Sequence, residues 1–522
     1  PITTSTARPI TVIARPDQHV GTTLYTGNNT VGREIDMGRK FDLVWVKKRN
    51  ANENHILVDT VRGANNFLMS DSNNRDNTSG GPITDLKDTS IVVDNNGYVN
   101  GNNDTYVAWT WRAGGSKGTF NVDDVGYANA SDVNMNVGAL NSAQYLKGQV
   151  WSGLMSVASG SFDQAATRAF DGFLKGGSDR LRTSDNQATV TMDLSSSPVT
   201  VSSQIKVHAE PGYNSSCTVT VGGVSHTSST GALHTFNVSG SLTEMTLQST
   251  QSGGRTYMEG MEIDGKLLVD DNVTVNSPSV ANTGCSVGTK QGFSIVAYNA
   301  TGSDLRVSHG LSERPGFIIL KSKNVSGDWL VWHQSLSSNT HFLKLNVTQN
   351  QAQADNVFLS VDQHTFATGD DSGINSGGQQ KLAYLWQDVP GLQKFGKWTN
   401  NNSIYGAYIN LGFKPAIILL KCIDAGEDWY IIDPIRHPYN QPAPSNSAAD
   451  AVNTLNPNTN HSEATSRGGH TNTTVDILSN GFKIRSTNTA AGEISYGTRN
   501  YVYAAWAEAP AFNLYGAQSN AR

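Results

Sequence analysis

The sequence predicts an all-β protein: tandem antiparallel β-sandwich domains in three related copies, with a jelly-roll domain inserted between the first and the second. One observation is a pattern that occurs three times, in which an apolar strand ending in lysine is followed by a second apolar run and later by an aromatic strand. Another is the abundance of turn-forming residues, including 51 glycines, because many short strands need many turns. A third is that no long segment has the spacing of an amphipathic helix, which argues against βαβ folds.

The repeated pattern has four parts. The lysine-ending strands are expected at 38–47, 315–321 and 415–421, the second apolar runs at 55–59, 328–332 and 428–433, and the closing aromatic strands at 106–111, 382–386 and 501–506. A further strand precedes each closing strand, and in the first and third copies it starts at Asn96-Gly97 and Asn480-Gly481, a dipeptide that favours turns because both residue types tolerate positive φ. We expect the strands of each sandwich to bury one face and expose the other.

The domain boundaries follow from where this pattern starts and stops. The segment 145–275 lacks the pattern but alternates apolar and polar residues with period two, which indicates a separate β-domain. The third copy contains a polar insertion at 441–474, which is expected to be an exposed loop. The predicted organisation is an N-terminal arm at 1–22, a first sandwich at 23–115, a linker at 116–144, the inserted jelly roll at 145–275, a linker at 276–291, a second sandwich at 292–391, and a third sandwich with a C-terminal tail at 392–522.

Length and charge limit the classes of protein that fit. A chain of 522 residues is too long for one core, so several domains are expected. Charged residues make up only 16% of the chain and the net charge is −6, which argues against nucleic-acid binding, since that function needs a concentrated basic surface. No stretch approaches the ~20 apolar residues that span a bilayer. No basic segment followed by an apolar one is seen at the start, so no secretory signal is expected, and Pro1 follows either a removed methionine or a fragment boundary.

The three cysteines, Cys217, Cys285 and Cys422, are far apart in the sequence, and their number is odd. An odd number cannot pair completely within one chain. We therefore expect buried or half-buried free thiols in a protein that folds in a reducing cytoplasm.

Two acid–base pairs recur at the same place in the first and third copies, Asp59 with Arg62 and Asp433 with Arg436. They could contact a sugar or a partner protein, or they could be structural ion pairs at the end of the second apolar run. Recurrence favours the structural role, because it suggests a task in the fold. The second copy has the sequence 332–336 in place of the pair.

Lysines and tryptophans also recur. Lys47, Lys321 and Lys421 end their strands and are expected to protect exposed sheet edges against pairing. Most tryptophans lie inside apolar strands and are expected in the core: Trp109, Trp111, Trp329, Trp386, Trp429 and Trp506. Trp332 and Trp398 are less regular, so we expect them at the surface as binding contacts.

Metal and catalytic sites have weaker signals. Asp171, Glu259 and Asp264 could supply oxygen ligands to a hard cation, although Asp264-Gly265 also predicts a hairpin turn. His461, Glu463 and His470 lie in the polar insertion, and they are expected to be a solvated loop, so no metal site is assigned to them. No catalytic residue is assigned, because the chain lacks the nucleophile-elbow, zinc-protease and phosphate-loop motifs, and the separation of two glycosidase carboxylates cannot be read from a sequence.

The repeat resembles domains of tail-fibre and tail-associated proteins of marine bacteriophages, especially those that infect cyanobacteria. The similarity covers about 24–114 and 293–522, and the segments that carry it are 55–63, 106–114, 428–433, 478–485, 503–508 and 519–522. The inserted domain resembles galactose-binding-like jelly rolls of the discoidin type through 169–172, 192–194 and 261–265.

The resemblance implies a virion protein, located in a tail or other appendage and synthesised in the host cytoplasm. The partners that it implies are further copies of the chain in a homotrimer, phage tail or capsid proteins, and a host surface glycan or outer-membrane component, with no nucleic acid. Discoidin-type domains often bind sugars through loops at one end of the sandwich, and some hold calcium there. Calcium is therefore a candidate ligand of the inserted domain, with Asp171 and Glu259 as candidate binding residues, and no other cofactor is expected.

Three functions stay open. The leading hypothesis is a non-enzymatic tail fibre that recognises and adheres to the host surface. The alternatives are a purely structural capsid or tail fibre or adaptor without receptor binding, and an enzyme that degrades host polysaccharide. Incubation with host cells and isolated surface glycan separates them, since they predict adhesion without cleavage, neither, and cleavage.

Overall fold

A computed structural model describes most of the chain, and its strands fall into two compact units. The described residues are 13, 15–130, 145–172, 180–209, 216–228, 233–250, 254–273, 280–362, 364–401, 403, 405–438, 440, 453–463, 475–485, 494 and 497–511. The first unit comprises 1–136, 280–357 and 361–522, and the second comprises 137–279 with 358–360. Strands account for 48% of the structure and helices for 4%, so the all-β prediction is confirmed.

The first unit, together with 358–360 of strand β32, contains one sheet order three times, in sets of strands that we call copies 1, 2 and 3. In copy 1 the four-stranded sheet has the order β1-β7-β3-β4 and a three-stranded sheet has the order β2-β6-β5. The strands are β1 (Val20–Thr26), β2 (Arg33–Asp36), β3 (Leu43–Lys48), β4 (Ile56–Asp59), β5 (Ile83–Leu86), β6 (Ser90–Val93) and β7 (Thr105–Trp111), and a short 3-10 helix, η1 (Pro16–Gln18), precedes them. β1 begins inside the segment expected to be an extended arm, so that expectation is wrong for Val20 onward.

Copy 3 has the orders β35-β41-β37-β38 and β36-β40-β39, and copy 2 has the corresponding orders β26-β34-β28-β29 and β27-β33-β32. The strands of copy 3 are β35 (Gln393–Thr399), β36 (Tyr408–Asn410), β37 (Phe413–Cys422), β38 (Trp429–Ile432), β39 (Val475–Leu478), β40 (Gly481–Ile484) and β41 (Asn500–Pro510). Those of copy 2 are β26 (Phe293–Asn299), β27 (Leu305–Ser308), β28 (Pro315–Ser322), β29 (Leu330–His333), β30 (His341–Lys344), β31 (Ala352–Gln353), β32 (Phe358–Val361), β33 (Thr365–Thr368) and β34 (Gln380–Gln387), with the short helix α2 (Ser372–Asn375). That the copies arose by duplication stays a prediction.

The large sheet of copy 2 is longer than those of copies 1 and 3. It continues beyond β26 through β25 (Asn282–Gly288), β8 (Phe120–Val122) and β9 (Val125–Tyr127). β25 pairs with β26 on one side and, in parallel, with β8 on the other. The segments expected to be linkers at 116–144 and 276–291 therefore contain strands of the copy 2 sheet.

Strand register defines which positions of the three copies are equivalent. Leu43 of copy 1 pairs with Asp59 and Trp111 on its two sides, and Phe317 of copy 2 pairs in the same way with His333 and Trp386. In copy 3, Ile417 pairs with Trp506, and the next pair along the neighbouring strands is Ile418 with Ile432. By this register, Asp59, His333 and Asp433 are equivalent.

The large sheets are buried on both faces, which differs from the expectation that one face meets solvent. One face of β3 contributes Val44 and Val46 to a core inside copy 1, and the other contributes Leu43 and Trp45 to a core shared by all three copies. The reason is that the outer face of each sandwich packs on the other copies. Continuous apolar strands are typical of sheets covered on both faces.

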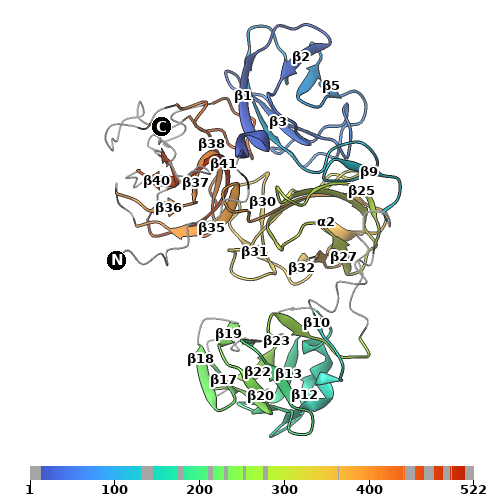
Figure 1. The fold of residues 1–522 in the computed structure, drawn as a ribbon, viewed down its shortest axis with the longest axis vertical. Coiled ribbons are helices and arrows are strands. Elements are labelled where there is room, and N and C mark those ends of the chain that lie inside the picture. The colour runs from blue at the N-terminus through green and yellow to red at the C-terminus, as the bar shows by residue number, and fades with distance from the viewer. Residues whose placement is uncertain are drawn as a thin grey trace, which may run out of the picture. The chain divides into compact units, whose positions relative to one another are not determined.

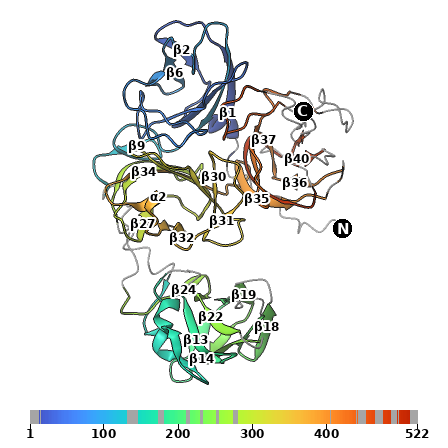
Figure 2. The ribbon, with the colours of Figure 1, turned by 180° about the vertical axis from the view of Figure 1, so that it is seen from behind.

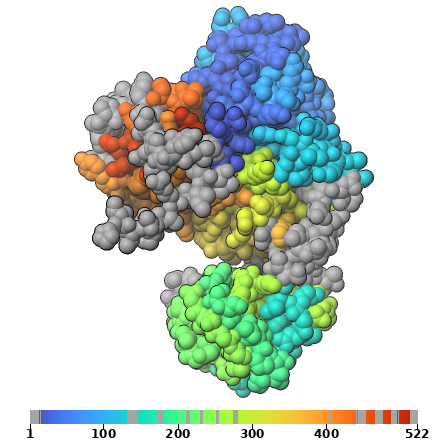
Figure 3. All heavy atoms as spheres, viewed as in Figure 1, coloured from blue at the N-terminus to red at the C-terminus, as the bar shows by residue number. Residues whose placement is uncertain are grey.

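Three tryptophans meet in the shared core, one from each closing strand. Trp111 lies 5.4 Å from Trp506 and 6.3 Å from Trp386 between ring centroids, and Trp386 lies 5.7 Å from Trp506. Copy 1 (blue), copy 2 (yellow) and copy 3 (orange to red) lie around this centre (Figure 1) and are seen from behind in Figure 2. In the space-filling view, the surfaces of copies 1 and 3 adjoin (Figure 3). The core position expected for these tryptophans is confirmed.

The second unit is a β-sandwich with its own core. Two five-stranded sheets have the orders β10-β24-β23-β16-β19 and β11-β14-β21-β17-β18, with two smaller sheets, β12-β13-β22 and β15-β20. Its elements are β10 (Tyr145–Leu146), η3 (Trp151–Leu154), β11 (Met155–Val157), β12 (Phe162–Gln164), η4 (Ala166–Ala169), β13 (Leu181–Asn186), β14 (Val190–Asp193), β15 (Val199–Val201), β16 (Ile205–His208), β17 (Cys217–Val221), β18 (Val224–Ser228), β19 (Leu233–Phe236), β20 (Gly240–Leu242), β21 (Glu244–Ser249), β22 (Arg255–Met258), β23 (Gly260–Ile263) and β24 (Lys266–Leu268). Asp264 and Gly265 form the turn between β23 and β24 with φ of 49° and 77°, so the predicted hairpin is confirmed.

The three cysteines are buried and none of them forms a disulfide, as expected. No helix among the described residues is long and apolar enough to cross a membrane.

Candidate functional site

The three copies meet at three junctions, which we call 1–2, 1–3 and 2–3 after the copies that form them. At each junction, a buried strand-end lysine of one copy reaches a backbone carbonyl of the other. Lys321 Nζ donates to Asn73 O at the 1–2 junction (3.0 Å), Lys47 Nζ to Asn460 O at the 1–3 junction (3.2 Å), and Lys421 Nζ to Thr348 O at the 2–3 junction (2.8 Å). These lysines are at most 1% exposed, so the expectation that they protect sheet edges is wrong.

Burial has an electrostatic cost for these lysines, because it disfavours the charged ammonium. It lowers the pKa of Lys321 to about 8 and the pKa of Lys421 to about 8. The carbonyls that accept their hydrogen bonds compensate part of this cost. The lysines therefore act as polar ties between copies.

The Asp–Arg pairs form a second kind of tie. Arg62 Nε donates to Asp59 Oδ2 at 2.6 Å, and both side chains are fully buried. Tyr384 of copy 2 donates its hydroxyl to the same Asp59 oxygen at 2.8 Å. Arg62 also contacts Asp76 through Nη1 at 2.9 Å. Burial lowers the pKa of Arg62, but the carboxylates of Asp59 and Asp76 and the Tyr384 phenol outweigh this effect, so its pKa is raised.

The pair in copy 3 has the same arrangement at the 1–3 junction. Arg436 Nε donates to Asp433 Oδ2 at 2.6 Å, and Trp109 of copy 1 donates its indole N–H to the same oxygen at 3.0 Å. The Arg436 guanidinium also lies 5.3 Å from the centre of the Trp109 ring. Each pair thus holds an aromatic hydrogen-bond donor of the neighbouring copy.

Copy 2 lacks the pair, and its neighbour lacks the donor. Ala504 occupies the position in copy 3 that Trp109 and Tyr384 occupy in copies 1 and 2, by the register of the closing strands. His333, at the Asp59 position, instead contacts the carbonyl oxygen of Tyr503 through Nε2 at 3.0 Å. Copy 2 therefore lacks the Asp–Arg pair, and copy 3, which contacts it at this place, lacks the aromatic hydrogen-bond donor.

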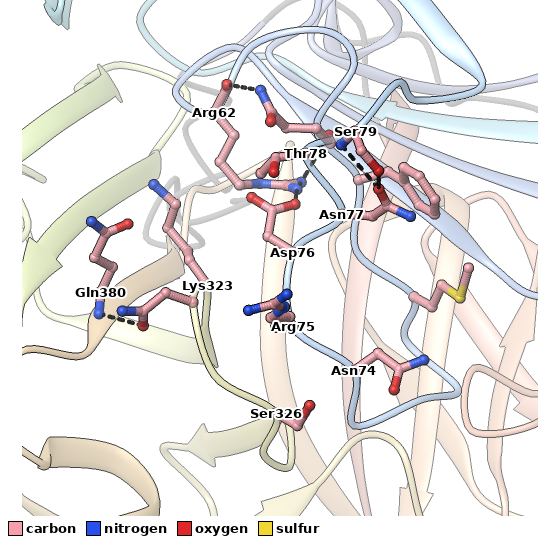
Figure 4. Close-up of a pocket in the computed structure, with 14 residues that line it drawn as sticks. Arg62, Asn74, Arg75, Asp76, Asn77, Thr78, Ser79, Lys323, Ser326 and Gln380 are labelled. Carbon is pink, nitrogen blue, oxygen red and sulfur yellow. Dashed lines mark hydrogen bonds and ion pairs between the residues drawn. The ribbon is translucent and has the colours of Figure 1, made fainter.

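A pocket of about 680 Å³ lies at the 1–2 junction. Ten lining residues come from the segment after β4 in copy 1, including Asn74 and Arg75, and four come from copy 2: Lys323, Asn324, Ser326 and Gln380. Figure 4 shows the copy 1 residues along one wall and Lys323 and Gln380 along the other. Most of these side chains are polar, so the pocket offers many hydrogen-bonding groups.

Backbone pairing holds the copy 1 wall in place. Leu57 and Leu68 exchange backbone hydrogen bonds of 2.9 and 3.1 Å, and Phe67 and Asn77 exchange bonds of 3.2 and 3.0 Å. Across the junction, the Asp76 amide donates to Lys323 O at 2.8 Å. The wall is therefore anchored at both ends, with Asn74 and Arg75 exposed between the anchors.

The pocket lining is poor in acidic groups. Among the residues that line the pocket, Asp76 alone carries a carboxylate, and this carboxylate is bound to Arg62. Burial raises the pKa of Asp76, while the Arg62 charge lowers it. A glycosidase places two carboxyl groups about 5–10 Å apart around the bond that it cleaves.

The surface role predicted for two tryptophans is wrong. Trp332 is 1% exposed, with its indole N–H donating to Asn339 O at 3.2 Å, and Trp398 is 7% exposed and stacks on Tyr501 at 4.9 Å. Both lie on the apolar faces of strands, where packing against other aromatic or basic side chains outweighs their irregular sequence positions.

The predicted acidic residues have different outcomes. Asp171 is half-buried and Glu259 is buried, and neither lies at the pocket. Among the described residues, no group of three or more His, Cys, Asp or Glu side chains is placed to hold a metal ion, and calcium in the second unit stays a prediction. Asp264 accepts backbone N–H bonds from Ser202 and Gln204, which lower its pKa.

The polar insertion is only partly described, and His470 lies outside the described residues. Its segment 453–463 is ordered against copy 1, and Glu463 accepts ionic hydrogen bonds from Arg49 (2.7 Å) and Arg436 (3.0 Å). The expectation of a solvated loop is therefore wrong for Glu463, while His461 nearby is exposed, as expected.

Sequence reasoning missed the pocket residues Arg75 and Lys323, because no motif marks them. Alignment of the copies offers one signal: Lys323 is two residues beyond Lys321, and Arg49 and Ile423 occupy the same place after Lys47 and Lys421. This alignment distinguishes Ile423 from the two cations, but it does not distinguish Lys323 from Arg49.

Comparison with known proteins gives one family. A protein-family model described as a domain of unknown function (DUF7483) matches residues 15–139 and 187–510. The matched range includes the three copies and most strands of the second unit. No curated protein matches the chain.

Proposed function

The chain belongs to the DUF7483 family, and we propose that it acts as a bacteriophage virion appendage, a tail fibre, that adheres to the host surface through a glycan. The family model assigns no activity. The proposal rests on the pocket at the 1–2 junction together with the resemblance of the repeat to phage tail-associated domains.

The pocket is the observation that carries the binding role. A pocket of about 680 Å³ has room for a few sugar units, and its walls present amide and hydroxyl groups from Asn74, Asn324, Ser326 and Gln380. Such groups pair with sugar hydroxyls, which donate and accept hydrogen bonds. The anchored copy 1 wall lowers the entropy lost on binding.

Weak individual binding suffices for adhesion when many copies act together. The proposal therefore includes further copies of the chain in a homotrimer, and tail or capsid proteins that fix it to the particle. The host-side partner is a surface glycan. The chain would act in the virion after synthesis in the host cytoplasm.

Adhesion of the purified protein to host cells tests the proposal. Asn74→Trp places a large ring in the pocket at an exposed position, and Asn95→Trp places the same ring on an exposed turn outside it. We expect labelled wild type and Asn95→Trp to bind the cells and Asn74→Trp to bind them poorly. Equal adhesion of all three proteins would exclude the pocket as the contact, and no adhesion of wild type would exclude the adhesive function.

A further inference from the structure

We propose that the pocket at the 1–2 junction selects an acidic saccharide, whose sulfate, carboxylate or phosphate group is held between Arg75 and Lys323. This inference rests on the proposed function, since it names the ligand class of the same pocket. It is carried by the charges of the lining and by comparison of the pocket with the other two junctions.

The lining has an excess of positive charge. It contains three cations, Arg62, Arg75 and Lys323, and one carboxylate, Asp76. Arg62 is already bound to Asp59 and Asp76, so its charge is neutralised inside the protein. Asp59 and Asp76 together carry one more charge than Arg62 compensates, and the Lys323 charge partly offsets the rise in the pKa of Asp76 that burial causes. With Asp59 included, three cations face two carboxylates, so a net positive charge on Arg75 and Lys323 is left for a ligand.

Both of these cations are available for contact. Arg75 is exposed and Lys323 is half-buried. In the part of the chain that the structure describes, neither side chain donates a hydrogen bond or forms an ion pair within 4 Å. Arg75 comes from copy 1 and Lys323 from copy 2, so the two approach a ligand from different walls (Figure 4).

The 1–3 junction shows what the protein does with the same cation when it serves the fold. Arg49 stands at the Lys323 position there, and Glu463 stands at the Asp76 position, since the Glu463 amide donates to Arg49 O just as the Asp76 amide donates to Lys323 O. Arg49 binds Glu463 through Nε at 2.9 Å and Nη2 at 2.7 Å. The charge of Arg49 is therefore compensated by Glu463 within the protein.

The 2–3 junction has no charge at these places. Ile423 replaces the cation and Gln351 replaces the acid, and the Gln351 amide donates to Ile423 O at 3.2 Å. Among the residues that the structure describes, the 1–2 junction is thus the one that keeps a cation at this position with no hydrogen bond or ion pair within 4 Å to its side chain. Structure alone does not require this cation, because the 2–3 junction forms without it.

The remaining lining groups suit a sugar rather than a bare ion. Arg75 offers a planar fork that matches an oxyanion in two hydrogen bonds, and Lys323 offers a point charge. Amide and hydroxyl groups of Asn74, Asn324 and Ser326 surround them and can bind the hydroxyls of the same saccharide.

Isothermal titration calorimetry on the full chain tests the inference. The probes are dextran sulfate, polygalacturonate, a phosphorylated mannan and neutral dextran, with inorganic sulfate and phosphate as free anions. The variants are Arg75→Ala, Lys323→Ala and the double variant, with Lys290→Ala as an exposed lysine outside the pocket. Unchanged circular dichroism and unfolding curves show that the variants are folded.

We expect at least one acidic polysaccharide to bind more tightly than neutral dextran, with binding that weakens as salt rises. Loss of one charge-assisted contact should weaken it about tenfold or more. Lys290→Ala should bind as wild type does. The acidic polymer that binds identifies the anion, and binding of free sulfate or phosphate alone, without preference for a saccharide, would overturn the saccharide part.

Two outcomes separate this inference from the proposed function. If wild type adheres to cells, but acidic polysaccharides do not compete and the double variant adheres equally, the charge selection is refuted and adhesion stands. If acidic polysaccharides bind and the double variant loses binding, but wild type does not adhere to host cells, the ligand class stands and the adhesive function is refuted.

Discussion

Replacing Arg62 by leucine is the sharpest test of the buried charges that tie copies 1 and 2 together. The Arg62 and Asp59 side chains have no exposed surface, and Asp76 has 4%. Arg62→Leu introduces the residue found at this position in copy 2, Leu336, but leaves two buried carboxylates without their cation. Removing one partner of a buried ion pair costs about 3–5 kcal/mol, so the free energy of unfolding should fall by about that amount.

Urea unfolding followed by tryptophan fluorescence measures this loss, because Trp151 is the single tryptophan of the second unit and the others report on the first. The control is Arg15→Leu. Arg15 forms an ion pair of similar length with Asp17, at 2.7 Å, but its side chain is 66% exposed. Exposed pairs contribute about 0–1 kcal/mol, so the control should change stability little.

A second variant tests the cause of the loss. The triple variant Asp59→His, Arg62→Leu, Asp76→Gln copies the set His333, Leu336 and Gln351 of copy 2. It leaves no unpaired carboxylate, and a neutral histidine still accepts the hydrogen bond from Tyr384. We expect it to be more stable than Arg62→Leu alone. A single variant that loses less than about 1 kcal/mol, or a triple variant no better than the single, would refute the buried-charge reasoning.

Three further predictions concern titration, thiol reactivity and a close backbone contact. Burial lowers the pKa of Lys381 to about 7, so the unfolded chain binds more protons than the folded one between pH 7 and the ordinary pKa of lysine, and the free energy of unfolding should rise with pH in this range. Lys381→Met should reduce the rise measured by urea unfolding at pH 7 and 9, and an unchanged rise would contradict the prediction. Burial raises the pKa of Cys217 to about 12 and of Cys285 to about 11, so both thiols should react with iodoacetamide in urea and not in native buffer, and native labelling would show that they are accessible. A Cβ on Gly481 would lie 2.0 Å from Ile409 O, so Gly481→Ala should destabilise copy 3 by about 1–3 kcal/mol, and a neutral effect would mean that β36 and β40 can separate.

The positions of most strands along the chain were predictable because they depend on local chemistry. The strand expected to start at Asn96-Gly97 is wrong, since 97–99 form a turn and the preceding strand, β6, ends at Val93. Lysine-ending strands, second apolar runs and closing strands all lie where the repeated pattern placed them, since apolar runs bounded by turns are strands in most contexts. The Asn480-Gly481 turn was placed correctly, but for a different reason: the turn residues are Ser479 and Asn480, and Gly481 begins β40 where the backbone of Ile409 leaves no room for a side chain.

The relation between copies was not predictable, because it depends on contacts between distant segments. From the residues next to it in the sequence, Lys47 is expected at a sheet edge. In the structure it is buried at the 1–3 junction, where it donates a hydrogen bond to Asn460 O. The burial of Trp332 was missed for the same reason, because it depends on contacts that the neighbouring sequence does not show. The pocket depends on two segments separated by about 250 residues, 74–79 and 323–326, and no local signal links them.

Having three copies in one polypeptide gives evolution a freedom that identical subunits lack. In a ring of identical chains, every substitution appears at all interfaces at once, so a change that creates a ligand site at one interface also weakens the others. In this chain, different residues form each of the three junctions, so each junction can change independently of the others. The 1–2 junction can acquire unpaired charge for recognition, while the contacts of Arg49 with Glu463 and of Ile423 with Gln351 continue to stabilise the 1–3 and 2–3 junctions.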